Sequence, residues 1–473
     1  MSEGTPLDTQ QKALAINLDR RKYGVFAEIG AGQEVARWFF RAGAASGTVA
    51  KSMSAYDMEV SDAIYGESVR YVSQDRLRHM LDHEWALLQK RLVPSRGKDT
   101  RFFVYANTVA ARSYSRAEDG LGWMGVRYQR EPGGPAHEVV LHTRLLDETN
   151  VQQQEVVGAV GVNLVHGVME GWKSPEELID ALLDNVGPRR AEVGMIRFSG
   201  PDFEGVDNRL MSLELVARGL TRAALFDARG EVVHPTDVLH NKAVLLERGN
   251  FRPVTHATLH LIRAGLAQFE KDPEVHGDEV EVLFEMTLRH LRERGTIDHQ
   301  DFLDRVDILG AVGASLVEDT KILVSNHAEF HRLAGYLFRY TKKPVGLVMG
   351  LPTLRELFKE SFYEDLEGGI LESFGRLFRN DLRLYVQPTL EEGNLVGVND
   401  LRVARHLRLL YRHLLENGGI RALEEVREDY LPIHTRDVLA QLRAGDEGWA
   451  DMVPAEAATL IRQRGLLGHG ASA

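Results

Sequence analysis

Short apolar runs alternate with amphipathic helical patterns through residues 191–398, and this alternation constrains the fold more than any other feature. Apolar strands separated by such helices favour a parallel sheet that is covered on both faces. The predicted strands are VGMIRFSG (193–200), AALFDAR (223–229), KAVLLERG (242–249), TKILVSN (320–326), PVGLVMG (344–350) and LRLYVQP (382–388). The predicted helices are 207–219, 255–269, two between 279 and 313, 327–340 and 351–362. We therefore expect a doubly wound, mostly parallel α/β domain over 191–398.

The residues before this region show a different pattern. Three β-like runs follow a strand and two helices, and PGGP (132–135) between the last two is a strong turn signal. This order predicts an antiparallel meander, followed by helices at 151–171 and 174–186. Further helical patterns lie around 400–418 and 434–444. We expect three domains: a mixed α+β domain with antiparallel strands (1–190), the α/β domain (191–398) and a C-terminal helical extension (399–473).

Composition indicates an ordinary globular chain, with 44% hydrophobic and 27% charged residues. The first 22 residues hold no apolar stretch of signal-peptide length, and the weakly polar run 156–169 is too short to span a bilayer. The sequence has no cysteine, which excludes disulfides and thiolate metal sites. We expect a cytoplasmic protein with no membrane partner.

The net charge of -12 argues against a surface that attracts nucleic acid everywhere. One helical pattern does carry four arginines at three- and four-residue steps, which places them on one face: Arg402, Arg405, Arg408 and Arg412. An amphipathic surface helix with a solvated face has the same pattern, and we favour that interpretation. Nucleic acid is not an expected partner.

Residues 249–260 resemble the G-x-F-x-P-x-H-x-G-H signature of nicotinate-mononucleotide adenylyltransferases through Gly249, Phe251, Pro253 and His256. In that signature the histidines lie six and nine residues after the glycine, where this chain has threonines. The spacing of the histidines therefore does not match the phosphate-binding signature, and a motif indicates function only when its residues have the required geometry. We predict a structural turn in which Pro253 and Thr255 end a loop and start a helix.

Most of the chain resembles an uncharacterised family of bacterial cytosolic proteins. The stretches that carry the resemblance are LDRRKYGVFAEIGAGQEVARWFFRAG, DNRLMSLELVARGLTRAALF and GNFRPVT. Names in that family include nicotinate-nucleotide adenylyltransferase, which looks like a label transferred through the short match at residues 249–256. The resemblance implies no catalytic residues.

Two glycine-containing segments resemble phosphate-binding loops. Gly30 and Gly32 lie between a predicted strand and a helix, as in dinucleotide-binding turns, but the third glycine is missing. Lys51 and Ser52 follow Gly47 by four and five residues, whereas a P-loop needs Gly, Lys and Ser in succession. We interpret the first as a tight strand-to-helix turn, with ligand binding as the alternative, and reject the second.

Three histidine pairs have the i,i+4 spacing that starts many zinc sites: His79/His83, His256/His260 and His327/His331. None has a convincing third ligand nearby in sequence, although Glu84 makes the first pair the leading candidate. We predict no metal site, and the sequence identifies no cofactor.

Polar residues follow several predicted strands, and ligands of open α/β sheets bind beyond the carboxyl ends of the strands. Hydroxyl, amide and guanidinium groups there suit a phosphate or carboxylate ligand. The predicted ligand-binding residues are Ser199, Gly200, Arg209, Arg248, Gly249, Ser325, Asn326 and Gly350. Ser325 and Asn326 have the alternative role of capping the next helix. Four of these, Ser199, Arg248, Asn326 and Gly350, are expected to cluster in space.

We expect an α/β protein that binds a phosphorylated or nucleotide-like metabolite, with transferase as the candidate reaction class. Arg209 and Arg248 would hold the anion, His327 would act as acid or base, and Glu247 would be its partner. A homo-oligomer is expected. The alternative is a non-catalytic oligomeric scaffold or regulatory protein, since a large α/β fold implies no activity by itself.

Overall fold

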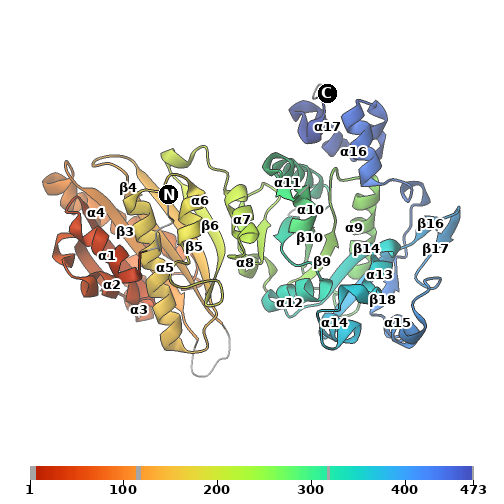
Figure 1. Cartoon of the computed structure of the whole chain (residues 1–473), viewed down its shortest axis with the longest axis horizontal. Coiled ribbons are helices and arrows are strands. Elements are labelled where there is room, and N and C mark those ends of the chain that lie inside the picture. Colours follow the sequence, from red (N-terminus) through yellow and green to blue (C-terminus); the bar gives the residue numbers. More distant parts are fainter. Residues whose placement is uncertain (1–6, 113–118, 294, 317–319, 471–473) are drawn as a thin grey trace. The chain divides into compact units, whose positions relative to one another are not determined.

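The computed structural model describes residues 7–112, 119–293, 295–316 and 320–470. The chain divides into two compact units, Met1–Thr221 and Arg222–Ala473 (Figure 1). Each unit is built on one large sheet with helices packed against it, which confirms the α/β class. No helix in the described part of the chain is long and apolar enough to cross a membrane.

The N-terminal unit contains a six-stranded sheet in the order β2-β1-β3-β4-β5-β6. Strand β1 is parallel to both of its neighbours, and the remaining pairs are antiparallel. The meander predicted around PGGP is therefore confirmed as β3-β4-β5. The strands are β1 (Lys22–Gly30), β2 (Val49–Ser54), β3 (Arg101–Ala110), β4 (Gly120–Gln129), β5 (Ala136–Leu145) and β6 (Ala191–Ser199).

Helices cover both faces of this sheet. The helices of this unit are α1 (Thr9–Leu18), α2 (Glu34–Ala42), α3 (Met58–Tyr65), α4 (Gln74–Arg96), α5 (Asn150–Glu170), α6 (Pro175–Ala181) and α7 (Asn208–Ala217). Apolar residues of α1, α2, α5, α6 and α7 form one core with the sheet. Helix α4 packs on the other face, where a Cβ on Gly125 would touch Leu81 and Leu77.

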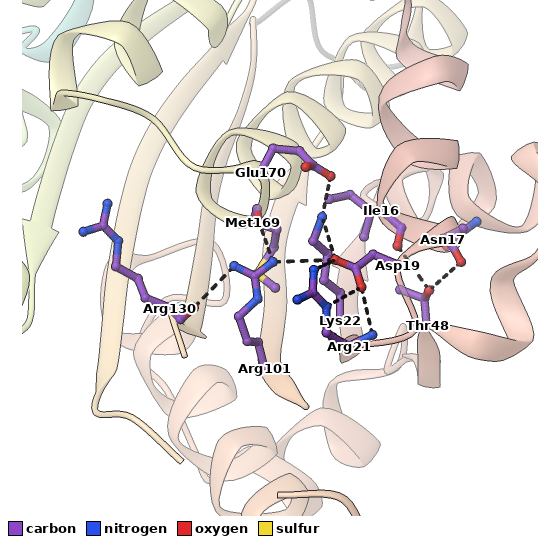
Figure 2. Close-up of polar contacts among 10 residues, drawn as sticks. All are labelled: Ile16, Asn17, Asp19, Arg21, Lys22, Thr48, Arg101, Arg130, Met169 and Glu170. Carbon is purple, nitrogen blue, oxygen red and sulfur yellow. Dashed lines mark hydrogen bonds and ion pairs between the residues drawn. The ribbon is translucent and has the colours of Figure 1, made fainter. Parts of the chain in front are cut away.

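The turn between α1 and β1 is fixed by a network of charged side chains (Figure 2). Asp19 accepts hydrogen bonds from the backbone N–H and the guanidinium Nε of Arg21, at 3.0 and 3.1 Å. Lys22, which is buried, pairs with Glu170 at the end of α5 at 2.5 Å, and lies 3.6 Å from Asp19. Arg101 at the start of β3 lies 4.0 Å from Asp19. The network therefore joins α1, β1, β3 and α5 at one end of the sheet.

The C-terminal unit contains an eight-stranded sheet in the order β18-β15-β14-β9-β10-β13-β7-β8. The five pairs from β18 to β13 are parallel, while β7 is antiparallel to β13 and to β8. The strands are β7 (Ala223–Phe226), β8 (Val232–Val233), β9 (Ala243–Arg248), β10 (Val280–Thr287), β13 (Lys321–Ser325), β14 (Val345–Gly350), β15 (Leu382–Gln387) and β18 (Ile420–Ala422). Two small hairpins lie outside it: β11 (Arg292–Glu293) with β12 (Thr296–Ile297), and β16 (Thr389–Glu391) with β17 (Asn394–Val396).

Helices pack on both faces, so the doubly wound, mostly parallel prediction is confirmed. One core joins β9 to α12, α13, α14 and α15, and α9 packs on the opposite face of β9 and β14. The helices are α8 (Pro235–Leu239), α9 (His256–Phe269), α10 (Leu288–Leu291), α11 (His299–Gly313), α12 (Phe330–Tyr340), α13 (Leu351–Leu357), α14 (Gly369–Leu377), α15 (Arg408–Glu416), α16 (Thr435–Ala444) and α17 (Ala455–Arg464). The helical C-terminus is thus confirmed, while independent folding of 399–473 stays a prediction.

Two sequence predictions about this region are wrong. The run at 193–200 was expected to open the parallel sheet, but β6 pairs antiparallel with β5 and belongs to the N-terminal unit. The compact units therefore meet at Thr221 and Arg222, not at the expected boundary between residues 190 and 191. The two helices expected between 279 and 313 are present as α10 and α11, but the strand β10, which precedes them and lies between β9 and β13, was not predicted.

Candidate functional site

The carboxyl ends of β9, β10 and β13 meet around a buried carboxylate. Glu285 of β10 is fully buried and accepts hydrogen bonds from the guanidinium of Arg248, with Nε to Oε2 at 2.6 Å and Nη2 to Oε1 at 3.2 Å. The hydroxyl of Ser325 donates to Oε1 of the same carboxylate at 2.5 Å. Glu285 therefore joins the ends of three neighbouring strands.

Arg248 also fixes the loop that leads into α12. Its two Nη atoms donate to the backbone carbonyls of His327 and Ala328, both at 2.9 Å, and its guanidinium lies 4.4 Å from the ring centre of Phe330. Only 8% of the Arg248 side chain is exposed. Arg248 is thus a buried residue that joins β9 to β10 and to the loop before α12, and its predicted role in holding an anion stays a prediction.

A cavity of about 760 Å³ opens beside this loop, and we call it the arginine cavity. Its lining consists of Arg222, Asn326, His327, His331, Arg332, Gly335, Tyr336, Phe338, Arg339, Arg376, Arg379 and Asn380. The lining residues come from the segment just before β7, the segment just after β13, α12, and the end of α14 with the residues that follow it. Five arginines thus converge, and the described lining includes no aspartate or glutamate.

Helix α12 contributes a stripe of residues to the cavity. Arg332, Gly335, Tyr336 and Arg339 follow i, i+3, i+4, i+7 spacing, which places them on one helix face. The Tyr336 ring lies 5.3 Å from the ring of His327, centre to centre, and the Arg339 guanidinium lies 5.8 Å from the Tyr336 ring centre. Aromatic and cationic groups therefore alternate along this wall.

His331 is the buried polar group of the cavity wall. Its side chain is 5% exposed, and Nδ1 lies 3.0 Å from the hydroxyl of Ser373 on α14. Burial lowers the pKa of His331, which favours the neutral ring. The other ring nitrogen, Nε2, is buried without a hydrogen-bond partner. Buried polar atoms are nearly always paired, so this nitrogen is an exception, although it has almost no accessible surface.

The structure brings together only part of the predicted site. Arg248, Asn326 and Gly350 end or follow parallel strands of one sheet and lie at the same edge, as expected. Gly249 follows Arg248, and its backbone N–H donates to the Glu285 carbonyl at 3.1 Å. Asn326 and His327 line the arginine cavity, whereas Arg248, Gly249, Ser325 and Gly350 do not. The alternative capping role for Ser325 is not seen, because its hydroxyl bonds Glu285 and the His327 N–H instead.

The expected partnership of Glu247 with His327 is not formed. Neighbouring residues of a strand point to opposite faces, so Glu247 faces away from the side of the sheet to which Arg248 and α12 belong. Glu247 is buried, its Oε2 has no hydrogen-bond partner, and burial raises its pKa well above the ordinary value. Burial therefore favours the neutral form of this carboxyl group within the sheet.

Three predicted site residues belong to the N-terminal unit. Ser199 ends β6, and with Gly200 it lines a hollow of about 300 Å³ beside Trp85 and Arg127. Arg209, at the start of α7, is paired with Asp207 at 2.6 Å. The predicted cluster of Ser199 with the strand ends of the parallel sheet is wrong, because β6 is part of another sheet.

The glycine turn after β1 is already filled by a side chain. Both carboxylate oxygens of Glu28 accept hydrogen bonds from the first turn of α2, from Val35 N at 3.1 Å and Ala36 N at 3.2 Å. A helix N-terminus attracts anions, and here the carboxylate of Glu28 occupies that position. A Cβ on Gly30 would lie 2.1 Å from the Val109 carbonyl oxygen. This geometry favours the structural interpretation of the turn.

The segment that resembles an adenylyltransferase signature starts a helix as predicted. Thr255 caps α9 by accepting a hydrogen bond from the Thr258 N–H at 3.3 Å. His256 stacks on Tyr430 with ring centres 5.3 Å apart, and His260 contacts the same ring edge-on at 5.9 Å. Both histidines are therefore packed against an aromatic side chain.

The histidine pair nearest to an acidic residue in sequence is also engaged structurally. Glu84 is buried, pairs with Lys51 and accepts a hydrogen bond from Tyr65 at 2.9 Å. The His83 ring packs edge-on against Tyr65. Among the described residues, no group of three His, Cys, Asp or Glu side chains is gathered in a metal-binding arrangement.

Fold and cavity together define an α/β protein with an arginine-lined hollow beside the carboxyl edge of a parallel sheet. No family model and no curated protein matches the chain. Solved structures to which it is similar include a competence/damage inducible protein of Agrobacterium tumefaciens (18% identity, 34% of this chain, 93% of that chain, TM-score 0.24). Another is a competence-damaged (CinA) superfamily protein of Enterobacter cloacae (12% identity, 38% of this chain, 96% of that chain, TM-score 0.25). A third is a CinA superfamily protein of Klebsiella pneumoniae (11% identity, 35% of this chain, 100% of that chain, TM-score 0.26). Similarity at this level assigns neither family nor activity, and none of these three names is that of an adenylyltransferase.

Proposed function

We propose that the C-terminal unit binds a phosphorylated metabolite in the arginine cavity. The observation that carries the proposal is the convergence of five arginines in a chain whose net charge is -12. Arginine binds phosphate through two parallel N–H···O bonds, and a phosphate group brings about 1.5 to 2 negative charges. Arg332 and Arg376 are paired with Glu329 and Glu372, and a ligand of this kind would add negative charge beside the other lining arginines.

The size of the cavity and its buried histidine support the same proposal. Small-molecule sites usually enclose about 300–1,000 Å³, and 760 Å³ suits a ligand of nucleotide or sugar-phosphate size. The unpartnered Nε2 of His331 offers a ring nitrogen to such a ligand. His327, on the same lining, stays the predicted acid–base group, now without Glu247 as its partner.

Arg379 provides the sharpest test. It lines the cavity, is exposed and has no hydrogen bond or ion pair with another described residue. Arg379→Ala should therefore change stability by no more than about 0.5 kcal/mol. Loss of one charged hydrogen-bonding group should weaken inorganic phosphate binding about tenfold, or about 1.4 kcal/mol.

The measurement is isothermal titration of the full chain with inorganic phosphate at constant ionic strength. Arg412→Ala is the matched control, since Arg412 is an exposed arginine on α15 that pairs with Glu416 and lies outside the cavity lining. It removes the same charge and should leave the affinity unchanged. Absence of saturable binding, or equal weakening in both variants, would contradict the proposal.

A further inference from the structure

The arginines of α12 are separated along the helix. Arg332 and Arg339 are seven residues apart on one face, and a rise of about 1.5 Å per residue places their Cα atoms about 10 Å apart. The guanidinium of Arg332 reaches back to Glu329, with Nε 3.1 Å from Oε2, and that of Arg339 reaches back over Tyr336. Each guanidinium contacts a residue three positions earlier in the helix, so the two charged groups are separated by about the same distance as their Cα atoms.

Two further arginines of the lining are Arg376 on α14 and Arg379, which follows the end of that helix at Leu377. The contact between His331 and Ser373 fixes where the two helices meet. Both helices lead into neighbouring parallel strands, β14 and β15, so both run from the carboxyl to the amino edge of the sheet. Arg376, one turn beyond Ser373, is close enough to His331 for its charge, like those of Arg332, Glu329 and Glu372, to act on that ring. Arg376 pairs with Glu372 at 2.5 Å, as Arg332 pairs with Glu329, so a phosphate would bind these two arginines beside their glutamate partners. Arg379 lies further along, in the direction of Arg339.

The middle of the α12 wall is uncharged. A Cβ on Gly335 would meet no atom within 4 Å, so the surface is open at this point. Tyr336 is the next residue of the lining, and its largely buried ring packs against His327. An uncharged carbon body fits this stretch better than a continuous chain of phosphates.

We propose that the ligand carries a phosphate group at each of two ends, joined by an uncharged body that lies along α12. Arg332 and Arg376 bind one phosphate, and Arg339 and Arg379 bind the other. This inference rests on the proposed function, since it assumes that the arginine cavity binds phosphate. The chemical class is a bisphosphorylated metabolite, as opposed to a monophosphate or a compact pyrophosphate.

The test compares three probes by isothermal titration with the full chain: hexanediol bisphosphate, hexyl phosphate and inorganic pyrophosphate. The bisphosphate should bind about tenfold or more tightly than either of the others, because its second phosphate binds intramolecularly. Arg332→Ala and Arg339→Ala should each reduce the affinity for the bisphosphate to about that of hexyl phosphate. The matched control, Arg412→Ala, should retain the full difference, and an unchanged urea midpoint in each variant would show that it is folded.

The outcomes separate this inference from the proposed function. Equal affinity for hexyl phosphate and the bisphosphate would refute the two-ended ligand and leave phosphate binding intact. Tightest binding of pyrophosphate would refute it in favour of one compact anion subsite. Failure of all three probes to bind would overturn the proposed function and the inference together.

Discussion

Replacement of Gly30 by alanine tests whether the glycine turn of β1 is required by packing. Gly30 has a φ of +75°, where a side chain is strained, and its Cβ would lie 2.1 Å from the Val109 carbonyl oxygen. That oxygen belongs to the backbone of β3 and accepts a hydrogen bond from Ala31 N at 3.0 Å. It cannot move without disturbing the pairing of β1 with β3. The steric conflict therefore adds to the backbone strain.

Gly43 separates the two contributions. It lies in the same unit, has a φ of +87°, and a Cβ there would meet no atom within 4 Å. Gly43→Ala should therefore lose only the backbone contribution, about 1–3 kcal/mol. Gly30→Ala should lose a further 1–3 kcal/mol or so through overpacking, for a total of about 2–6 kcal/mol.

The assay is urea unfolding of the full chain, followed by tryptophan fluorescence. Four of the five tryptophans, Trp38, Trp85, Trp123 and Trp172, belong to the N-terminal unit, so the signal reports mainly on that unit. The free energies of unfolding of both variants are compared with that of the parent protein. If Gly30→Ala loses no more stability than Gly43→Ala, the packing explanation is refuted and the turn is open for another role.

Three further predictions concern charged groups. Arg248→Ala should lower the free energy of unfolding by about 3–5 kcal/mol, because it leaves the buried carboxylate of Glu285 unpaired; a loss below about 1 kcal/mol in urea titrations would contradict this. Burial, opposed by the hydrogen bonds from α2 and Asn107, raises the pKa of Glu28 to about 8. The stabilising effect of protonated Glu28 is therefore complete below about pH 4.5 and is lost as the pH rises through 8. The free energy of unfolding should fall by up to about 1.4 kcal/mol per pH unit in this range, and this slope should disappear in Glu28→Gln. The Arg21 side chain and nearby charges hold the pKa of Asp19 at about 2, so its contribution is present above about pH 4 and is lost as the pH falls through 2. Asp19→Asn should cost about 1 kcal/mol at pH 7, since solvent screens the partly exposed pair, and should leave the Glu28-dependent slope unchanged.

Local periodicity predicted most elements of the fold, and its failures have physical causes. The run 101–110 was expected as a strand and forms β3 with the same bounds. Residues 280–287 were not predicted as a strand, yet apolar residues alternate at Val280, Val282, Phe284 and Met286, which is the strand period. The glutamates between these residues argued against a strand, because a charged residue is unusual in a central strand unless it is paired. In the structure Glu285 is paired with Arg248.

Strand pairing could not be derived from local pattern. The segment 191–219 has a strand followed by a helix, as does each βα unit of the parallel sheet. Only contact with β5, far back in the sequence, makes β6 antiparallel and places it in the other unit. The assignment of Ser199 to the strand-end cluster failed for this reason.

The sequence predicted only those residues of the candidate site that directly follow a strand. Asn326 and His327 follow β13 and were predicted from that position, and both line the arginine cavity. The arginines of α12 and α14 were missed, because arginines on exposed helix faces are ordinary in any soluble sequence. The i, i+7 spacing of Arg332 and Arg339 beside Gly335 is the signal that could have found them.

Glu28 also has a consequence for the ionic conditions under which this protein is studied. The carboxyl group of Glu28 is buried at the N-terminal end of α2 and accepts hydrogen bonds from its first turn, so a dissolved anion finds that position already filled. No carboxyl group lies among the described lining residues of the arginine cavity, although Arg332 and Arg376 pair with Glu329 and Glu372, and under the proposed function an anion from solution binds there. The choice of buffer anion is therefore an experimental variable for the C-terminal unit and a minor one for the turn at α2.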